Sequence, residues 1–220
     1  MSRLDPAVFI RMNLPVAAVS GVPEIRLHKA RPTSGLMRLA RQDEDGFGAP
    51  YWAHYWAGGL ALARYVLDHP GVVAGRRVLD LGAGSGLVGI AAAKAGAREV
   101  VAAEVDRYAL AALQLNMQLN ETPISVLHSD LTVSAPPETD LILVGDLFYA
   151  PDLSERVTAF LDRCSSCGIR ALVGDPWRAH LPVSRLTELA RYLVIEGGSD
   201  ARPSGVFAFT PRAGGDRQSA

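Results

Sequence analysis

Residues 77–93 read RVLDLGAGSGLVGIAAA, and this stretch decides the fold. It opens with a short apolar run, continues through a glycine-rich turn and ends in an Ala-rich segment, which predicts a strand, a turn and a helix. The glycines of such a turn let a ligand approach bare backbone amides at the N-terminus of the helix. Asp80 stands at the strand end, where a carboxylate attracts a positive charge and repels a pyrophosphate. The stretch therefore predicts a site for a cationic nucleoside.

From residue 77 onward the pattern alternates between strands and helices, which is typical of a parallel sheet with helices on both faces. Strands are expected at 77–81, 99–104, 124–128, 140–145 and 170–174. Helices are expected at 86–95, 107–119, 152–163 and 183–190. Two last strands, 191–196 and 205–210, have no helix between them, so one must run antiparallel. The predicted fold class is α/β: a doubly wound, mostly parallel seven-stranded sheet with a C-terminal antiparallel hairpin strand.

The first 70 residues carry weaker signals. Residues 1–20 are expected to be loosely structured, residues 24–29 alternate like a half-exposed strand, and residues 42–46 form an acidic loop. Residues 53–67 are expected as a helix rich in Ala, Leu and aromatic side chains, ended by Pro70-Gly71. The predicted organisation has three parts. Residues 1–70 form an N-terminal extension with an aromatic helix that contributes to the site, residues 71–212 form the ligand-binding core, and residues 213–220 form a disordered tail.

The bulk composition is ordinary for a globular protein, with 49% hydrophobic and 20% charged residues in a chain of 220. A net charge of −1 gives no strong basic field, so nucleic-acid binding is not expected. No apolar run reaches membrane-spanning length, so no membrane partner is expected, and the chain is predicted to be a monomer. The two cysteines, Cys164 and Cys167, have zinc-like spacing, but no second pair and no histidine cluster accompany them, so we expect no metal site. They make no disulfide framework either, which favours a bacterial cytoplasm and leaves a mitochondrial matrix open.

The ends of the predicted strands carry the candidate cofactor residues, because ligands of open parallel sheets bind at the carboxyl ends of the strands. The first three strands end at Asp80, Glu104 and Asp130. Glu104 is placed to accept from ribose hydroxyls, and Asp130 to accept from an exocyclic amine such as that of adenine. The predicted cofactor is S-adenosylmethionine, held by Asp80, Gly82, Ala83, Gly84, Gly86, Glu104, Asp130 and Trp56.

A dinucleotide site is the competing interpretation of the turn, because residues 84–89 match G-x-G-x-x-G. The first of these glycines lies three residues past the strand end, and the glycine nearest the strand is Gly82. Counting from Gly82, the third glycine position holds Leu87. This register, together with Asp80, makes a dinucleotide the weaker interpretation. A tight turn without any ligand is a further alternative, which the acidic strand ends disfavour.

The fourth strand ends in Asp146-Leu147-Phe148-Tyr149. A carboxylate beside aromatic rings suits a cationic amine, because the carboxylate orients the amine and the ring faces stabilise its charge. Asp146, Phe148 and Tyr149 are therefore the catalytic candidates. Asp146 alone would raise the pKa of an amine, so we expect it to orient the amine while water or desolvation removes the proton. The alternative is a helix-capping Asp followed by core aromatic residues.

Three further residues are candidates for binding the substrate. Asp175 and Arg178 follow the fifth strand at the same edge of the sheet, with a turn around a packed Trp as the alternative. Trp52 precedes Trp56 by one helical turn, and this pair either borders the adenosine or amine site or packs in the core. Asp106 is interpreted as the N-cap of the next helix.

Six segments carry a resemblance to known enzymes: PYWA at 50–53, WAGG at 56–59, LARY at 62–65, VLDLGAGSG at 78–86, GDLFY at 145–149 and GDPWR at 174–178. Residues 77–210 resemble a class I, seven-stranded S-adenosylmethionine-dependent methyltransferase with a Rossmann-like fold. More closely, the chain resembles the electron transfer flavoprotein β-subunit lysine methyltransferases and their bacterial relatives.

The resemblance implies a protein-lysine N-methyltransferase that acts on a protein such as the flavoprotein β-subunit. It also implies that the cofactor is held by Asp80, Gly82, Glu104 and Asp130. Asp146 and Tyr149 would border the lysine pocket. Two alternatives stay open. In the first, the chain is a methyltransferase whose substrate is a ribosomal protein or a nucleic-acid amine. In the second, it is a non-catalytic module that binds the nucleoside.

Overall fold

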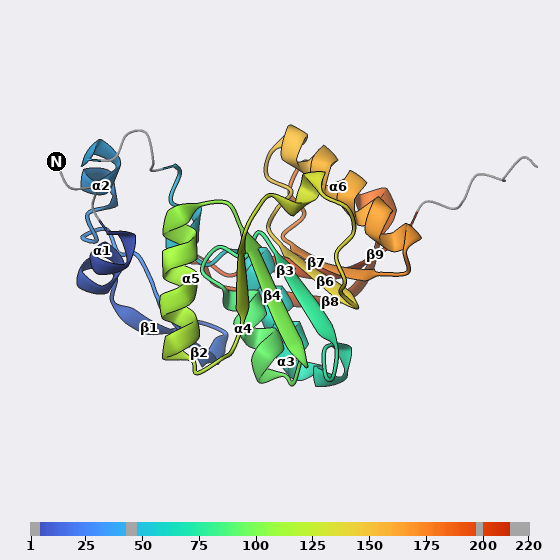
Figure 1. The fold of residues 1–220 in the computed structure, drawn as a ribbon, viewed down its shortest axis with the longest axis horizontal. Coiled ribbons are helices and arrows are strands. Elements are labelled where there is room, and N and C mark those ends of the chain that lie inside the picture. Colours follow the sequence, from blue (N-terminus) through green and yellow to red (C-terminus); the bar gives the residue numbers. More distant parts are fainter. Residues whose placement is uncertain (1–4, 43–47, 197–199, 212–220) are drawn as a thin grey trace, which may run out of the picture.

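The structure is a computed structural model that describes residues 5–42, 48–196 and 200–211. A sheet of seven strands lies at its centre, formed by β3 (Arg77–Leu81), β4 (Glu99–Glu104), β5 (Ser125–His128), β6 (Leu141–Gly145), β7 (Arg170–Asp175), β8 (Leu186–Val194) and β9 (Arg202–Phe209). The strand order is β5-β4-β3-β6-β7-β9-β8, with parallel pairing from β5 to β7 and antiparallel pairing of β9 to both of its neighbours (Figure 1). The predicted α/β fold with a C-terminal antiparallel hairpin is confirmed.

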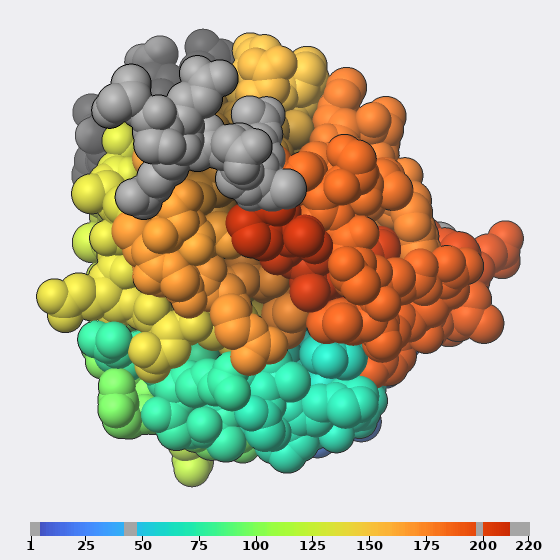
Figure 2. Space-filling model, turned by 90° about the vertical axis from the view of Figure 1, so that its right-hand side faces the viewer, coloured from blue at the N-terminus to red at the C-terminus, as the bar shows by residue number. Residues whose placement is uncertain are grey.

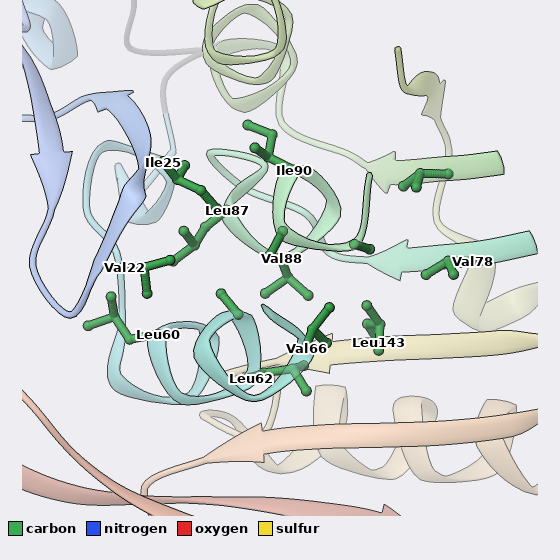
Figure 3. Packing of buried hydrophobic residues seen from close by; sticks show 14 of the residues in the cluster. Val22, Ile25, Leu60, Leu62, Val66, Val78, Leu87, Val88, Ile90 and Leu143 are labelled. Carbon is green, nitrogen blue, oxygen red and sulfur yellow. The ribbon is translucent and has the colours of Figure 1, made fainter. Parts of the chain in front are cut away.

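Helices cover both faces of the sheet. One face carries α3 (Ala57–Asp68), α4 (Leu87–Lys94) and α5 (Arg107–Leu119), and the other carries α6 (Pro151–Ser166). Successive strand residues point to opposite faces, so Val78 and Leu143 contribute to the core on the α3 side while Leu79 and Val144 contribute to the core on the α6 side. Figure 3 shows the first of these cores, in which apolar side chains of α3 and α4 point toward one another and toward Val78 and Leu143 of the sheet. Burial on both faces explains the continuous apolar runs of the central strands.

The N-terminal part of the chain packs against α5. It consists of α1 (Pro6–Asn13), a two-stranded antiparallel sheet of β1 (Val16–Val19) and β2 (Val22–His28), and α2 (Leu36–Gln42). The expectation that residues 1–20 are loosely structured is wrong for the described residues from 5 onward. Asp5 caps α1 by accepting from the Ala7 N–H at 2.8 Å, and Phe9 and Ile10 are buried. Asp-Pro at a helix start is the local signal for this cap.

Two further boundaries differ from the sequence prediction. No helix forms at 183–190, because a short 3-10 turn (Val183–Arg185) leads directly into β8. The side chains of Ala190, Tyr192 and Val194 pack on the core while Leu193 points to solvent, which is the two-residue period of a strand paired to β9. Tertiary pairing at the edge of the sheet outweighed the local helical pattern.

The aromatic helix begins later than expected. A 3-10 turn spans Tyr51–Ala53 and α3 starts at Ala57, so Trp52 and Trp56 do not share a helix. The predicted tail at 213–220 and most of the predicted acidic loop at 42–46 lie outside the described residues. Within the described residues, no helix is both long and apolar enough to cross a membrane. Figure 2 views the end of the molecule where the orange and red segments from α6 to β9 form much of the surface.

Candidate functional site

A cavity of about 790 Å³ lies at the carboxyl ends of β3, β4 and β6. Its walls come from the glycine turn after β3, the ends of β4 and β5, the loop after β6, the start of α6 and the aromatic segment before α3. Such a position is where ligands bind in open parallel sheets. Segments that are far apart in the sequence therefore meet in one place. Of the predicted site residues, those that line the cavity are Trp52, Trp56, Asp80, Gly82, Ala83, Gly84, Glu104, Asp130, Asp146, Tyr149 and Arg178.

The glycine turn forms the floor of the cavity. Gly82, Gly84 and Gly86 all have positive φ, at 66°, 53° and 86°, where side chains are rarely tolerated. A Cβ atom at Gly82 would lie 2.7 Å from the Leu147 side chain, whereas one at Gly84 would meet nothing closer than 3.9 Å. Gly84 thus leaves open space above the backbone. Gly86 does not line the cavity and serves as the left-handed N-cap of α4.

Asp80 is buried at the base of the cavity, with 2% of its surface exposed. The Gly89 N–H donates to its Oδ2 at 2.8 Å, and a Cβ atom at Gly89 would lie only 3.0 Å from that oxygen. Gly89 is therefore explained by the approach of Asp80, which accounts for the G-x-G-x-x-G match without a dinucleotide. Burial raises the pKa of Asp80 to about 7, and the nearby Glu104 adds to the rise. A bound cation would favour the charged form of this carboxyl.

Glu104 and Asp130 present carboxylates from the neighbouring strand ends. Glu104 accepts from the Gly84 N–H at 2.8 Å, so β4 and the glycine turn are tied together. Asp130 accepts from the Thr132 hydroxyl at 2.6 Å and pairs with Arg156 of α6 at 2.7 Å. Burial opposes the charge of Asp130, but the bonds from Thr132 and the pairing with Arg156 hold its pKa below the usual range.

The cavity is strongly acidic. Its lining includes six carboxyl side chains, those of Asp80, Glu104, Asp106, Asp130, Asp146 and Asp152. It includes two guanidinium groups, those of Arg156 and Arg178. An excess of one charge inside a cleft attracts ligands of the opposite sign. The predicted preference for a cationic ligand therefore has a structural basis in the whole cavity rather than in Asp80 alone.

At the other end of the cavity, Asp146 follows β6 in a left-handed backbone conformation with φ of 58°. Its Oδ2 accepts from the Gly59 N–H in the first turn of α3 at 2.5 Å, and its Oδ1 accepts from the Arg178 guanidinium at 2.7 Å. Burial raises the pKa of Asp146, and the contact with Arg178 opposes that rise. The capping interpretation was partly right, because Asp146 caps a helix, but the helix is α3, which lies far away in the sequence.

Tyr149 lines the cavity near its opening, with 46% of its surface exposed. The centre of its ring lies 5.2 Å from that of Tyr51, and the Tyr51 ring lies 6.1 Å from that of Trp56. The Trp56 indole N–H donates to the Tyr51 carbonyl at 2.9 Å, which holds this aromatic segment together. Three aromatic rings therefore lie next to one another in the wall of the cavity.

Some predicted residues do not reach the cavity. Phe148 is fully buried in the core on the α6 side, and Asp175 is fully buried at the end of β7. Asp175 accepts from the backbone N–H of Arg178 at 2.7 Å, so it contacts the site through Arg178. Trp52 lines the cavity but is mostly buried and stacks on Tyr108. Asp106 caps α5, as predicted.

Sequence reasoning missed Tyr51, Arg156 and the pair Gly58-Gly59. Tyr51 and the glycines belong to segments that carry the family resemblance, yet their contacts depend on where α3 lies. Arg156 sits inside α6, and nothing in its neighbourhood in the sequence distinguishes it from other exposed arginines.

Comparison with known proteins agrees with this geometry. Residues 61–147 match the family model described as ribosomal protein L11 methyltransferase. The electron transfer flavoprotein β-subunit lysine methyltransferase of Rattus norvegicus is 40% identical over 180 residues, which cover 79% of this chain and 70% of the relative. The Homo sapiens protein of the same name is 35% identical over 223 residues, which cover 96% of this chain and 85% of the relative. The solved structure of magnesium protoporphyrin IX methyltransferase from Synechocystis, with bound S-adenosylmethionine, shares the fold at a TM-score of 0.51 and 15% identity, over 94% of this chain and 99% of that one.

Proposed function

The chain belongs to the family of electron transfer flavoprotein β-subunit lysine methyltransferases, and we propose that it methylates lysine side chains of the electron transfer flavoprotein β-subunit of its own cell. Membership makes it an S-adenosylmethionine-dependent methyltransferase that acts on protein lysines. The observation that carries the proposal is the acidic cavity above the glycine turn, whose lining includes the Asp146 carboxylate and a group of aromatic rings.

The residues of the cavity fit the cofactor. S-adenosylmethionine carries a sulfonium and an ammonium group, which suit a lining with more carboxylates than guanidinium groups. We assign Asp80 to the positive end of the cofactor, Glu104 to the ribose hydroxyls and Asp130 to the exocyclic amine of adenine. Gly84 supports this assignment, because the space above its backbone would be filled by a side chain. Arg156 keeps Asp130 charged and in place.

The reaction end of the cavity is proposed to hold the lysine. When bound, the cofactor supplies an activated methyl carbon, which the neutral lysine nitrogen takes with its lone pair as the C–S bond breaks and the bonding electrons stay on sulfur. Asp146 orients the amine, and Tyr149 and Tyr51 stabilise its positive charge before and after transfer. Arg178 offsets the rise in amine pKa that Asp146 alone would cause, so the amine proton passes to water. Phe148 supports the loop from the core.

The direct test combines the purified protein, purified β-subunit and S-adenosylmethionine with a labelled methyl group. We expect methyl-lysine on the β-subunit by mass spectrometry and none with Asp146→Ala. Methylation of a ribosomal protein in a lysate but not of the β-subunit would contradict the proposed substrate, as would a signal that is lost after nuclease treatment. Cofactor binding by calorimetry without any methylated product would indicate a nucleoside-binding module.

Tyr149 offers a test of the aromatic wall. We expect Tyr149→Ala to raise the KM for the protein substrate about tenfold, because a cation–π contact contributes roughly 0.5–2 kcal/mol and 1.4 kcal/mol corresponds to a factor of ten. Tyr149→Phe keeps the ring and should stay close to the wild-type KM. The Kd for S-adenosylmethionine, measured by calorimetry, should change little in either variant. Equal KM values for the Ala and Phe variants would contradict this role.

We also propose a reducing compartment, the bacterial cytoplasm, for this protein. Cys164 and Cys167 are both unbridged thiols, of which Cys164 is buried. Burial raises the pKa of the Cys164 thiol to about 11, so it remains protonated and inert. The monomeric state stays a prediction that gel filtration with light scattering tests.

A further inference from the structure

Arg178 lies between two buried carboxylates at the back of the cavity. Its Nη2 donates to Asp146 Oδ1 at 2.7 Å, its backbone N–H donates to Asp175 Oδ1 at 2.7 Å, and its Nε lies 3.8 Å from Asp175 Oδ2. Asp146 is 8% exposed and Asp175 is fully buried. Charges in such positions are tolerated only when they are paired. Arg178 pairs with both of them, and the charge of Arg202 also acts on Asp175.

The backbone around Arg178 is built to aim this side chain. Trp177 has a positive φ of 59°, which is unusual for a residue other than glycine. Its ring packs edge-on against Phe207 of β9 at 5.5 Å, and the Arg191 guanidinium of β8 lies 4.5 Å from the ring centre. The hairpin thus secures Trp177 on one side while the next residue turns into the cavity. Residues held in strained conformations cluster at functional sites.

We propose that Arg178 is a positioning residue that keeps the Asp146 carboxylate charged and correctly oriented where it meets the lysine. The inference rests on the proposed function, in which Asp146 orients the amine. A buried carboxyl without a cation takes up a proton as the pH falls towards neutral. The ionised group only accepts hydrogen bonds, whereas the protonated group also donates one. The guanidinium cannot lose its proton, so the pair stays ionised across the working range.

Other groups act on Asp146 as well. The Gly59 N–H at the start of α3 also stabilises the charged carboxylate, and Glu196 accepts from the Ala57 N–H of the same helix end. Further titratable or charged groups face the cavity or the pair, namely Tyr51, His54, Tyr55, Asp80, Glu104, Asp106, Asp130, Tyr149, Asp152, Arg156, Asp175 and Arg202. Burial raises the pKa of Asp175 to about 6, and the nearby Arg178 charge opposes that rise, so Asp175 also titrates at higher pH when Arg178 is replaced. The effect of Arg178 on Asp146 is therefore separated from that on Asp175 by a measurement that follows the Asp146 carboxyl itself.

The first experiment is the pH profile of single-turnover methylation at saturating cofactor, from pH 7 to 10. We expect Arg178→Met to move the acid limb up by at least one pH unit, so that the rate at pH 7.5 falls about tenfold and recovers at alkaline pH. Arg178→Lys keeps a cation and should leave the limb near its wild-type position. In an Asp146→Asn background, Arg178→Met should add little, since the two residues act as one unit.

Arg64→Met is the matched control. Arg64 is equally exposed, at 23%, and pairs with two carboxylates, Glu24 and Asp68, but it does not line the cavity. Its removal should leave the pH profile unchanged. A uniform rate loss in Arg178→Met at every pH would show a merely structural role and overturn the proposal.

A second measurement needs no protein substrate. Carbon-13 NMR of Asp-labelled protein follows the Asp146 carboxyl directly, and we expect its titration midpoint to rise by at least one unit in Arg178→Met. An unchanged midpoint would overturn the role of Arg178 whether or not the β-subunit is methylated. Wild-type protein that fails to methylate the β-subunit while the midpoint shifts would contradict only the proposed substrate. Circular dichroism verifies that each variant is folded.

Discussion

Gly58→Ala is expected to lower the melting temperature by about 2–12 °C and to remove most of the methyl transfer, whereas Gly59→Ala changes both very little. A Cβ atom at Gly58 would overlap the carbonyl oxygen of Gly174 in β7, and it would lie 2.6 Å from the carbonyl carbon and 2.8 Å from Asp146 Oδ2. Backbone atoms cannot move aside as a flexible side chain does. The start of α3 must therefore shift away from the sheet.

The size of the effect follows from overpacking. Forcing extra atoms into a packed site costs about 1–3 kcal/mol or more, and 1 kcal/mol shifts the melting temperature by roughly 2–4 °C in a chain of this length. At Gly59 the added Cβ would meet Asp146 Oδ2 at 3.6 Å, which is an ordinary contact. Alanine also favours a helix over glycine by about 1 kcal/mol, so Gly59→Ala is neutral or slightly stabilising.

Activity should fall with Gly58→Ala even where the protein stays folded. The shift of α3 withdraws the Gly59 N–H from Asp146 and disturbs the carboxylate that orients the amine. Scanning calorimetry and the labelled methyl-transfer assay check both parts. Equal melting temperatures for the two alanine variants would show that the close approach of α3 and β7 does not limit stability.

Asp80→Asn is expected to stabilise the ligand-free protein at pH 8 while it weakens S-adenosylmethionine binding at least tenfold. The pKa of Asp80 rises from 3.8 to about 7 on folding. The folded state thus binds this proton more tightly than the unfolded state, so the contribution of Asp80 to stability is full at low pH and is lost as the pH rises from about 4 to about 7. The neutral amide of Asn avoids that loss.

We expect a gain on the order of 1–3 kcal/mol at pH 8, since each pKa unit corresponds to about 1.4 kcal/mol and the Asn amide leaves part of its hydrogen bonding unmet. Binding weakens because a hydrogen bond to a charged group contributes roughly 1.5–3 kcal/mol. In wild type the affinity for the cofactor should also fall as the pH drops below 7 and Asp80 takes up its proton. That dependence should be much weaker in Asp80→Asn.

Calorimetric titration between pH 6 and 8 and thermal unfolding between pH 4 and 8 provide the measurements. Glu138→Gln is the control, because it removes one negative charge, as Asp80→Asn does, at a side chain that is 95% exposed. It should change neither the affinity for the cofactor nor the stability. Tight binding by Asp80→Asn would contradict the assignment of Asp80 to the positive end of the cofactor. A wild-type stability that does not fall relative to the variant as the pH rises would contradict its buried, protonated state.

The residues near the glycine turn could be predicted from sequence because their structure is local. The apolar run before Asp80, the positive-φ glycines and the apolar helix after them depend on neighbours within a few positions, so the strand, turn and helix could all be read from residues 77–93. The Asp106 cap follows the same logic, since its bonds reach only two and three residues ahead. Alternation of such local units also indicated that the sheet is mostly parallel.

The reaction end could only be decided by the tertiary structure. Asp146 bonds to Gly59 and to Arg178 across 87 and 32 positions of sequence, and β8 is a strand because it pairs with β9. No local pattern encodes how closely α3 approaches β7, because that distance depends on glycines in two separate elements meeting at one point. The sequence by itself therefore determined the fold and predicted the cofactor, through short-range propensity and strand-end position. Packing of α3 against the sheet decided the charge and orientation of the residues proposed to meet the lysine.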